Sequence, residues 1–464
     1  MTSAGWRDLL GPKYLGASTV LAGGVALYAT NEFLTVSLLP SAVAEIGGQR
    51  LYAWVTTVYL VASVVAATTV SATVARLGPR WSYLAALGVF AVGSTMAAVA
   101  PTMQLLLVGR TVQGAAGGLL AGLGYAVINS ALPSSLWTKA SALVSAMWGV
   151  GTLLGPAAGG LFAQFGSWRW AFGALTVLTV AMAFLVPFAL PGRRPSDEPR
   201  TPSRIPVWSL LLLGAAALAI SVAGIPRNIA ITAALLVAGV LLVGLFLVVD
   251  RRLTASVLPP SAFRPGPLKW IYLTLGLLMA ATMVDMYVPL FGQRLAHLVP
   301  VAAGFLGVAL SIGWSVGEII SASVTRSRLI VRIVAVAPLV MAVGLGLAAV
   351  SQVENAPVGV IAVWVVALMI TGAGIGAAWP HLSAWAMGSV DEPGEGGVAA
   401  AAINTVQLIC GAFGAGLAGV VVNLTDRGDE TAAQWVFGVF AVLAAIGTLA
   451  SHRASRGQHT RLDR

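Results

Sequence analysis

The sequence predicts an all-α polytopic membrane protein, and three observations support this fold class. The chain of 464 residues is 58% hydrophobic and only 9% charged, a balance that no water-soluble domain presents to solvent. Apolar runs of about 20 residues, each long enough to cross a hydrocarbon core about 30 Å thick, recur along its whole length. Lys and Arg are concentrated in alternate connections between these runs. These features together indicate a bundle of transmembrane helices.

Fourteen apolar segments are predicted to span the membrane. Their approximate bounds are 16–39, 51–75, 81–101, 104–132, 138–164, 170–190, 207–225, 229–250, 268–291, 301–323, 328–350, 357–383, 396–423 and 432–451. Residues 1–15 contain Arg7 and Asp8, and no small-residue cleavage site follows the first apolar run. We therefore expect no signal peptide.

The basic residues predict the orientation of the chain, because Lys and Arg are enriched in cytoplasmic loops. With the N-terminus inside, twenty of them fall on the cytoplasmic side and only Arg50, Arg169, Arg227, Arg294 and Arg427 on the other. This bias places both termini in the cytoplasm and requires an even number of spans. It also explains the net charge of +10 without a nucleic acid partner.

Weak internal similarity indicates a duplicated organisation. The segments 71–76 and 321–326 share four of six residues, and each closes a predicted span. Two spans between the halves, 207–225 and 229–250, have no counterpart in either half. We therefore predict a six-helix bundle over 1–190, a linker and inserted helical hairpin over 191–266, a second six-helix bundle over 267–451 and a cytoplasmic tail over 452–464. Bundles of this kind face one another across a cavity in many secondary transporters.

A ladder of glycines occupies the fifth predicted span, at Gly151, Gly155, Gly159 and Gly160, with Pro156 inside it. Glycines four residues apart lie on one helix face and allow another helix to approach closely, while a proline bends the helix. Taken alone, the ladder is equally compatible with a simple packing face. The thirteenth span echoes it at Gly411, Gly414, Gly416 and Gly419.

Two further motifs carry a family resemblance. The fourth span contains Arg110-Thr111-Val112-Gln113-Gly114, and the sixth begins with Trp168-Arg169-Trp170-Ala171-Phe172. With the glycine ladder, these motifs resemble the major facilitator superfamily, and specifically its fourteen-helix drug:proton antiporters. The resemblance implies two six-helix bundles with an inserted hairpin and alternating access. It also implies export of lipophilic or cationic compounds in exchange for protons, so that the proton gradient supplies the energy and no cofactor is needed.

The sequence departs from the family pattern at two places. In the loop after the second span the family carries Gly-x-Leu-Ala-Asp-Arg-x-Gly-Arg, and only Arg76, Gly78 and Arg80 match it here. Ala75 stands where the acidic latch is usual, so gating must differ in detail. The first span offers Asn31-Glu32 in place of the subfamily's Asp-x-Thr pattern, and Glu32 is our candidate substitute for that aspartate.

Four ionisable residues inside predicted spans are candidates for proton coupling, since such residues are costly in a membrane: Glu32, Arg110, Asp285 and Glu318. A proton arriving at Glu32 would weaken its attraction to Arg110; the alternative is a static Glu32–Arg110 pair. For Asp285 we weigh proton binding or recognition of a cationic substrate against a hydrogen-bonded structural role. For Glu318 the alternative is an exposed acid or an ion pair with Arg326 or Arg328.

A set of mostly aromatic residues is predicted to line an apolar cavity for substrate by stacking and dispersion: Tyr28, Phe33, Gln113, Trp148, Met283, Trp314 and Trp379. Gln113 is also expected to support Arg110 through hydrogen bonding. The alternative for the aromatic residues is packing between helices or contact with lipid. His381 titrates near neutral pH in its free form, but a single histidine near a helix end is more often structural.

Other kinds of chemistry find no support. Cys410 is the only cysteine, the four histidines have no ligand spacing, and no phosphate-binding loop or nucleophile–base pattern occurs, so we expect no disulfide, metal, ATPase or enzyme. The expected partners are the lipid bilayer, a small hydrophobic or cationic substrate and protons, with no nucleic acid.

The sequence carries no signal for the oligomeric state, and a monomer is our expectation. The paucity of lysine indicates a GC-rich bacterial genome and hence a plasma membrane. The rival hypotheses are export of an endogenous lipid or metabolite, and a receptor or scaffold that kept the fold.

Overall fold

The computed structural model describes residues 6–133, 136–192, 205–226, 228–253, 256–390, 396–425 and 428–462. These residues form helices joined by short connections, as the predicted all-α class requires. The chain divides into two compact units. The N-terminal unit comprises Met1–Gln49 and Val58–Ile205, and the C-terminal unit comprises Arg50–Thr57 and Pro206–Arg464.

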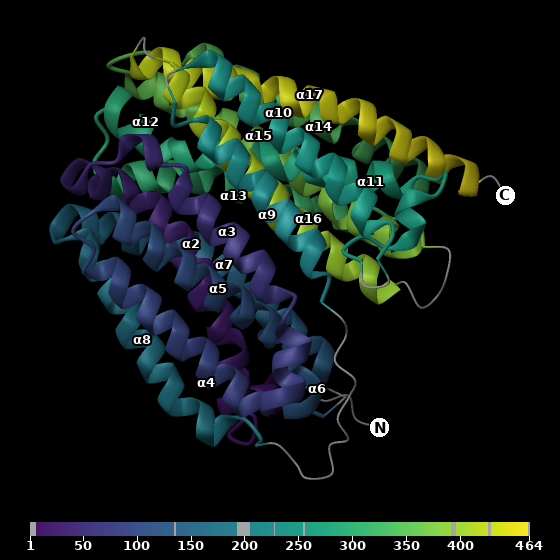
Figure 1. Cartoon of the computed structure of the whole chain (residues 1–464). Coiled ribbons are helices and arrows are strands. Elements are labelled where there is room, and N and C mark those ends of the chain that lie inside the picture. Colours follow the sequence, from purple (N-terminus) through teal and green to yellow (C-terminus); the bar gives the residue numbers. More distant parts are fainter. Residues whose placement is uncertain are drawn as a thin grey trace. The chain divides into compact units, whose positions relative to one another are not determined.

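Six long helices make up most of the N-terminal unit (Figure 1). α2 packs against α5, α7 and α8, and α4 packs against α5 and α8. The first residues of α3, up to Thr57, belong to the C-terminal unit. The helices described are α1 (Trp6–Leu9), α2 (Leu15–Ile46), α3 (Trp54–Ala67), α4 (Val70–Ala98), α5 (Met103–Ala126), α6 (Ile128–Ala131), α7 (Trp137–Phe165) and α8 (Trp168–Ala189).

The C-terminal unit contains nine α-helices among its described residues. They are α9 (Val207–Ala223), α10 (Ile229–Asp250), α11 (Leu268–Thr282), α12 (Val288–Leu295), α13 (Pro300–Ala322), α14 (Ser327–Ser351), α15 (Val358–Gly388), α16 (Gly396–Leu424) and α17 (Asp429–Leu462). Short 3₁₀ segments are η1 (Gln49–Leu51), which spans the division between units, η3 (Pro260–Phe263) and η4 (Met283–Tyr287). α13 packs on α15, α14 packs on α15 and α17, and α11 packs on α16 and α17 (Figure 1).

The hairpin that the sequence analysis placed between the halves is present as α9 and α10, which pack on each other, with α9 also packing on α16. Asp250, at the end of α10, fixes this hairpin to the chain that follows. Its buried carboxylate accepts hydrogen bonds from Ser209 Oγ at 2.7 Å, Val257 N at 2.8 Å and Leu258 N at 2.9 Å. A buried carboxylate with three donors is satisfied, and it joins α9, α10 and the connection toward α11.

Twelve helical segments of the described chain are long and apolar enough to cross a membrane. The other two predicted spans correspond to α2, which carries Asn31 and Glu32 among its 32 residues, and α9, which is apolar but has only 17 residues. A nearly all-helical protein with many candidate membrane helices is therefore established. The count of fourteen and the four-part division of the chain stay predictions.

The loop predicted between the second and third spans is a single tight turn. The second span is interrupted between α3 and α4, and the first residues of α4 continue it as far as Gly78. Gly78 has φ of 75°, in the left-handed region that L-residues with a Cβ rarely adopt. Pro79 then opens the next helical stretch, where its missing N–H costs no hydrogen bond. The glycine of the motif is thus required by the backbone.

Two predicted boundaries differ from the structure. The ninth predicted span is broken into α11, η4 and α12. The helix of the fourteenth predicted span, α17, continues past residue 451 to Leu462 and includes most of the predicted tail. The polar sequence after Ala450 gave the predicted end of the span, but a helix can extend beyond an apolar core wherever its sequence permits.

Candidate functional site

A buried arginine lies at the centre of a polar network in the N-terminal unit. The Arg110 side chain on α5 is only 1% exposed. Its Nη1 donates to Asn31 Oδ1 on α2 at 3.1 Å and to Gln113 Oε1 at 2.9 Å. Gln113 Nε2 in turn donates to Ser94 Oγ on α4 at 2.9 Å. The network therefore links three helices through the guanidinium.

An aromatic ring on a fourth helix completes this environment. The guanidinium carbon of Arg110 lies 4.1 Å from the centroid of the Tyr59 ring on α3, a cation–π arrangement. Tyr59 stacks on Tyr28 with centroids 5.5 Å apart, and Tyr28 meets Trp148 edge-on at 5.4 Å. Tyr28 and Trp148, both predicted substrate residues, thus lie next to the arginine network.

Glu32 follows Asn31 on α2, and its carboxylate interacts electrostatically with Arg110. The side chain is half-buried. The sequence analysis expected Gln113 to hydrogen-bond Arg110, and the structure has this bond, but it also gives Asn31 as a partner of Arg110 on the same helix as Glu32. We shall call Arg110, Asn31, Gln113, Ser94 and Tyr59 the arginine network.

Three members of the arginine network were missed by sequence reasoning: Asn31, Ser94 and Tyr59. Asn31 carried a usable signal, because a carboxamide in an apolar span is expensive unless it is hydrogen-bonded. Ser94 and Tyr59 carried none, since small hydroxyl and aromatic residues are frequent in membrane helices.

The glycine ladder of α7 faces α2, the helix that carries Asn31 and Glu32. A Cβ added at Gly151 would lie 2.5 Å from Ala29 Cβ, one at Gly155 would lie 2.6 Å from Phe33 Cβ, and one at Gly159 would lie 2.5 Å from Leu34 O. Each distance is below any normal contact, so only glycine permits this approach. Phe33, a predicted substrate residue, is therefore held against α7.

The remaining positions of this ladder reinforce the same contact. Pro156 lies inside α7, and its carbonyl oxygen accepts a hydrogen bond from Ser37 Oγ of α2 at 3.1 Å. Gly160 is buried. The predicted close approach of another helix is thus found, and its partner is α2.

The turn after the second span is tied to the end of the unit's last helix. Arg80 donates through Nε and Nη2 to the carbonyl oxygen of Leu190, at 3.1 and 3.0 Å. Arg76 is exposed on the turn beside Gly78. The three residues that match the family motif therefore surround one backbone turn, and their role in gating stays a prediction.

The candidate residues of the C-terminal unit lie in two places. Asp285 and Met283 lie on the 3₁₀ segment η4. Glu318 on α13 accepts a hydrogen bond from Trp314 Nε1 at 3.1 Å, and the Trp314 ring lies 5.5 Å from that of Trp379 on α15. Glu318 thus has a polar partner on its own helix, where the sequence analysis weighed Arg326 or Arg328 as its partner.

His381 on α15 has a local partner as well. Its Nε2 lies 2.9 Å from Ser321 Oγ and 3.1 Å from Ser321 O, at the end of α13. These contacts agree with the structural role that the sequence analysis favoured. No cluster of three or more His, Cys, Asp or Glu residues suited to a metal occurs in the described part of the chain.

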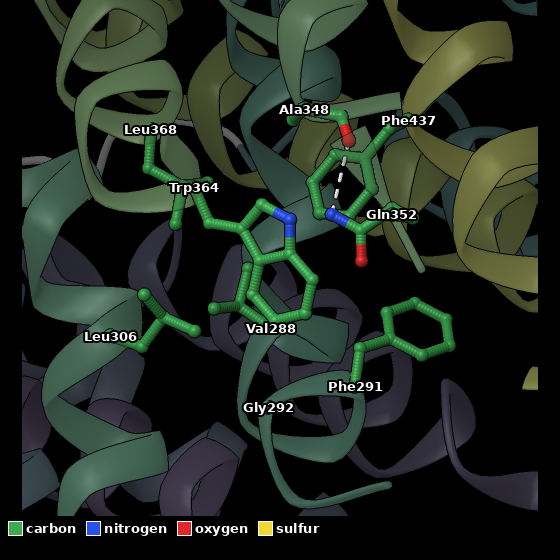
Figure 2. Close-up of a pocket in the computed structure, with 9 residues that line it drawn as sticks. All are labelled: Val288, Phe291, Gly292, Leu306, Ala348, Gln352, Trp364, Leu368 and Phe437. Carbon is green, nitrogen blue, oxygen red and sulfur yellow. Dashed lines mark hydrogen bonds between the residues drawn. The ribbon is translucent and has the colours of Figure 1, made fainter. Parts of the chain in front are cut away.

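A hollow inside the C-terminal unit was not predicted. It holds about 240 Å³ of space, part of it open to the surroundings. Figure 2 shows the Trp364 indole beside the carboxamide of Gln352, whose nitrogen donates to Ala348 O at 3.0 Å. The lining is otherwise apolar: Val288, Phe291, Gly292, Leu306, Ala348, Trp364, Leu368 and Phe437. With one carboxamide and no charge, it is suited to apolar contacts.

Comparison with known proteins connects this geometry to a family. The profile of the Major Facilitator Superfamily matches residues 21–415. The chain is 64% identical over 454 residues to a "Probable multidrug-efflux transporter" of Mycobacterium tuberculosis strain H37Rv, covering 97% of this chain and 96% of the relative. It is 24% identical over 279 residues to the "Multidrug efflux pump SdrM" of Staphylococcus aureus, covering 60% of this chain and 62% of that protein.

Solved structures show the same fold. A bacterial homologue of the human lysosomal transporter Spinster, in an inward-facing and occupied conformation, aligns with a TM-score of 0.67 at 12% identity, covering 96% of this chain and 97% of that one. The human organic anion transporter MFSD10 aligns with a TM-score of 0.61 at 16% identity, covering 95% and 99%. The buried arginine motif, the glycine ladder and these matches agree, and the chain belongs to the major facilitator superfamily of membrane transporters.

Proposed function

We propose that this protein is a proton-coupled exporter of lipophilic or cationic drugs that works as an antiporter by alternating access. The relative with 64% identity bears the name of a probable multidrug-efflux transporter and matches nearly the whole chain, which supports a drug as the cargo. The proposal places the protein in a bacterial plasma membrane with both termini in the cytoplasm, in accord with the distribution of basic residues.

The observation that carries proton coupling is Glu32 beside the arginine network. A carboxylate and a buried guanidinium that interact electrostatically form a pair whose attraction depends on whether the carboxyl holds a proton. Protonation of Glu32 removes that attraction. The Arg110 cation still donates to the oxygens of Asn31 and Gln113 and still lies over the Tyr59 ring. These interactions stabilise the buried cation when Glu32 is neutral.

The α2–α7 contact transmits this event. Glu32 lies on α2, and the residues that contact the glycine ladder lie on the same helix. The ladder brings α2 and α7 into close contact. A shift of Glu32 relative to Arg110 therefore moves α2 and α7 together, as a bistable packed pair. In the proposed cycle this movement favours one access state when Glu32 is protonated and the other when it is not.

Purified protein in liposomes tests the proposal. With an acidic lumen and a fluorescent lipophilic cation outside, antiport moves dye inward and raises the lumenal pH. Glu32→Gln keeps the shape and removes the titrating charge, so we expect both fluxes to fall to the level of empty liposomes. Glu45→Gln is the matched control, because Glu45 lies at the end of the same helix and its side chain is 52% exposed.

Opposite, coupled fluxes in the wild type that vanish only in Glu32→Gln would support the proposal. Dye movement that ignores the pH difference would exclude proton coupling, and equal transport by Glu32→Gln would remove Glu32 from the mechanism. If folded wild-type protein moves neither dye nor protons, drug export is wrong, and lipids and metabolites become the cargoes to screen.

A further inference from the structure

A proline breaks the ninth predicted span close to Asp285. Pro289 in α12 has no N–H to donate to the carbonyl oxygen four residues earlier, that of Asp285. The Val288 N–H donates to Asp285 O instead, and Met283–Tyr287 forms the 3₁₀ segment η4. This break lies inside Leu268–Leu295, whose apolar window is 72% buried, the largest share among the twelve candidate spans. Discontinuous helices at membrane depth are where transporters build binding sites.

One oxygen of the Asp285 carboxyl is left without a partner at this break. Its Oδ1 is buried and has no hydrogen-bond partner among the described residues. It lies against Gly307 of α13, where an added Cβ would be 3.3 Å from Oδ1. No ion pair within the described residues includes Asp285, and Arg294 at the end of α12 pairs with Asp429 at 2.8 Å. A hydrogen-bonded structural role therefore does not describe this oxygen.

The residues next to Asp285 in the sequence are apolar or aromatic. Tyr287 lies two residues further along and stacks on Phe291 with centroids 5.9 Å apart. Met283 and Met286 flank the acid on η4 and supply polarizable thioethers. A carboxylate on an apolar segment favours a large, weakly hydrated cation over a small, strongly hydrated one, because the strongly hydrated ion loses more hydration free energy on leaving water.

The acid of the N-terminal unit has the opposite surroundings. Glu32 interacts with the positive charge of Arg110, which repels a second cation. No arginine or lysine is bonded to Asp285 within the described residues. We infer that Asp285 binds the cationic group of the cargo, while the Glu32 carboxyl exchanges protons. This inference rests on the proposed function and assigns a specificity-determining residue within it.

Binding in detergent tests this assignment without any gradient. Tetraphenylphosphonium and the neutral triphenylphosphine oxide are titrated against purified wild type and Asp285→Asn. We expect Asp285→Asn to lose about tenfold or more in affinity for the cation, corresponding to about 1.4 kcal/mol, with unchanged affinity for the neutral compound. Glu430→Gln is the matched control, since Glu430 is a half-buried acid of the same unit whose carboxylate accepts hydrogen bonds from Glu354 N and Gln434 Nε2.

A second variant keeps the test decisive if Asp285→Asn does not fold. Gly307→Ala places a methyl group against Oδ1 without altering charge, and we expect it to weaken cation binding while sparing the neutral compound. Equal cation binding by wild type and both variants would overturn the inference, as would equal loss of both ligands. Dye movement in wild-type liposomes that ignores the pH difference would overturn the proposed proton coupling alone, because the binding titration needs no gradient.

Discussion

The two units carry a similar ion pair with its charges exchanged. In the N-terminal unit the acid, Glu45, ends the first long helix and the base, Arg169, begins the last. In the C-terminal unit the base, Arg294, ends α12 and the acid, Asp429, begins α17. The positions of the contact are the same, and the residues are not. The two units therefore share a contact between helix ends that is made by different residues.

The helices α5 and α15 pack against a neighbouring helix of their own unit in the same way. In α5, Gly114 and Gly118 lie against the carbonyl oxygens of Tyr59 and Ser63 of α3. In α15, two glycines with the same spacing, Gly372 and Gly376, lie against the carbonyl oxygens of Leu310 and Trp314 of α13. A Cβ at any of these four glycines would collide with backbone. Close glycine contacts of this kind are what membrane helices use to approach one another.

A third glycine in each unit shows which residues of α5 and α15 correspond. Gly93 of α4 faces the residues one and five before Gly114, and Gly344 of α14 faces the residues one and five before Gly372. Four residues before each reference glycine stand Arg110 in α5 and Leu368 in α15, both buried. Leu368 lines the apolar hollow, whereas Arg110 organises the arginine network. The glycine packing is similar in the two units, but a charged residue stands at this position in α5 and an apolar one in α15.

The largest expected effect comes from making α5 resemble α15 by Arg110→Leu. The change removes the donor from Asn31 and Gln113, and breaking a buried polar network by removing a charged partner costs roughly 3–5 kcal/mol. We expect a large fall in the thermal unfolding temperature in detergent and complete loss of gradient-driven export. Leu368→Met is the control, with a cost of less than about 1.5 kcal/mol. Export retained by Arg110→Leu would contradict a central role for the arginine.

Alanine substitutions at the matching glycines are expected to have a smaller effect, and they test whether the two glycine contacts are equivalent. Gly114→Ala and Gly372→Ala each push a methyl group into the backbone of a neighbouring helix, and we expect each to destabilise its unit by about 1–3 kcal/mol. The control is Gly346→Ala in α14, where nothing lies within 4 Å of the added carbon. That change should be neutral or stabilising by about 0.5–1 kcal/mol. A loss confined to one of the two units, measured by thermal unfolding, would show that the contacts are not equivalent.

Sequence reasoning recovered what motifs and composition encode. The membrane class follows from apolar content, and Arg110 with Gln113 follows from a motif whose spacing of three residues places both side chains on one helix face. Asn31 and Tyr59 were beyond its reach, because they join Arg110 from helices whose neighbours in space no periodicity reveals. The matching glycine contacts of the two units were equally hidden, since the 321–326 repeat is short and the twelfth-span glycines belong to no motif that we recognised.

Backbone breaks were partly readable. Pro289 stands four residues after Asp285, and a proline inside an apolar span predicts a break at the residues before it. We placed a continuous span there because its hydropathy is uninterrupted. Gly78 was recognised as a motif residue, but its positive φ depends on how tightly two helices are joined, which hydropathy does not report.

Tyr59 of α3 faces Gly114 as Leu310 of α13 faces Gly372, so the two residues are counterparts. Tyr59→Leu removes the ring beneath the Arg110 guanidinium, and loss of a desolvated cation–π contact costs about 0.5–2 kcal/mol. We expect a lower unfolding temperature. We also expect a shifted pH profile of export, because Arg110 interacts with Glu32 and loses the aromatic ring that stabilises its charge. Tyr59→Phe keeps the ring and loses the hydroxyl, which donates to Tyr28 O at 3.3 Å, so it should change the pH profile less than Tyr59→Leu does. An unchanged pH profile in Tyr59→Leu would limit Tyr59 to packing.

The smallest expected effect concerns the exchanged ion pairs. Hydrogen bonds from Trp168 and Arg169 hold the pKa of the Glu45 carboxyl below its usual range. A depressed pKa in the folded state means that the pair stabilises at neutral pH and that this contribution is lost as the pH falls through the folded pKa. Because the pair is exposed, we expect Glu45→Gln to cost at most about 1 kcal/mol at pH 7, and less in high salt.

The same pair offers a direct exchange experiment. The double variant Glu45→Arg with Arg169→Glu gives the N-terminal unit the charge order of the C-terminal unit. If position rather than residue identity is what the halves share, the double variant should recover part of the stability lost in either single variant. The recovery is expected to be incomplete, because Arg169 also donates to Ala100 O and lies over the Trp168 ring, and a glutamate can do neither. Thermal unfolding of the wild type, both single variants and the double variant measures this coupling, and strict additivity would mean that the pair contributes nothing as a pair.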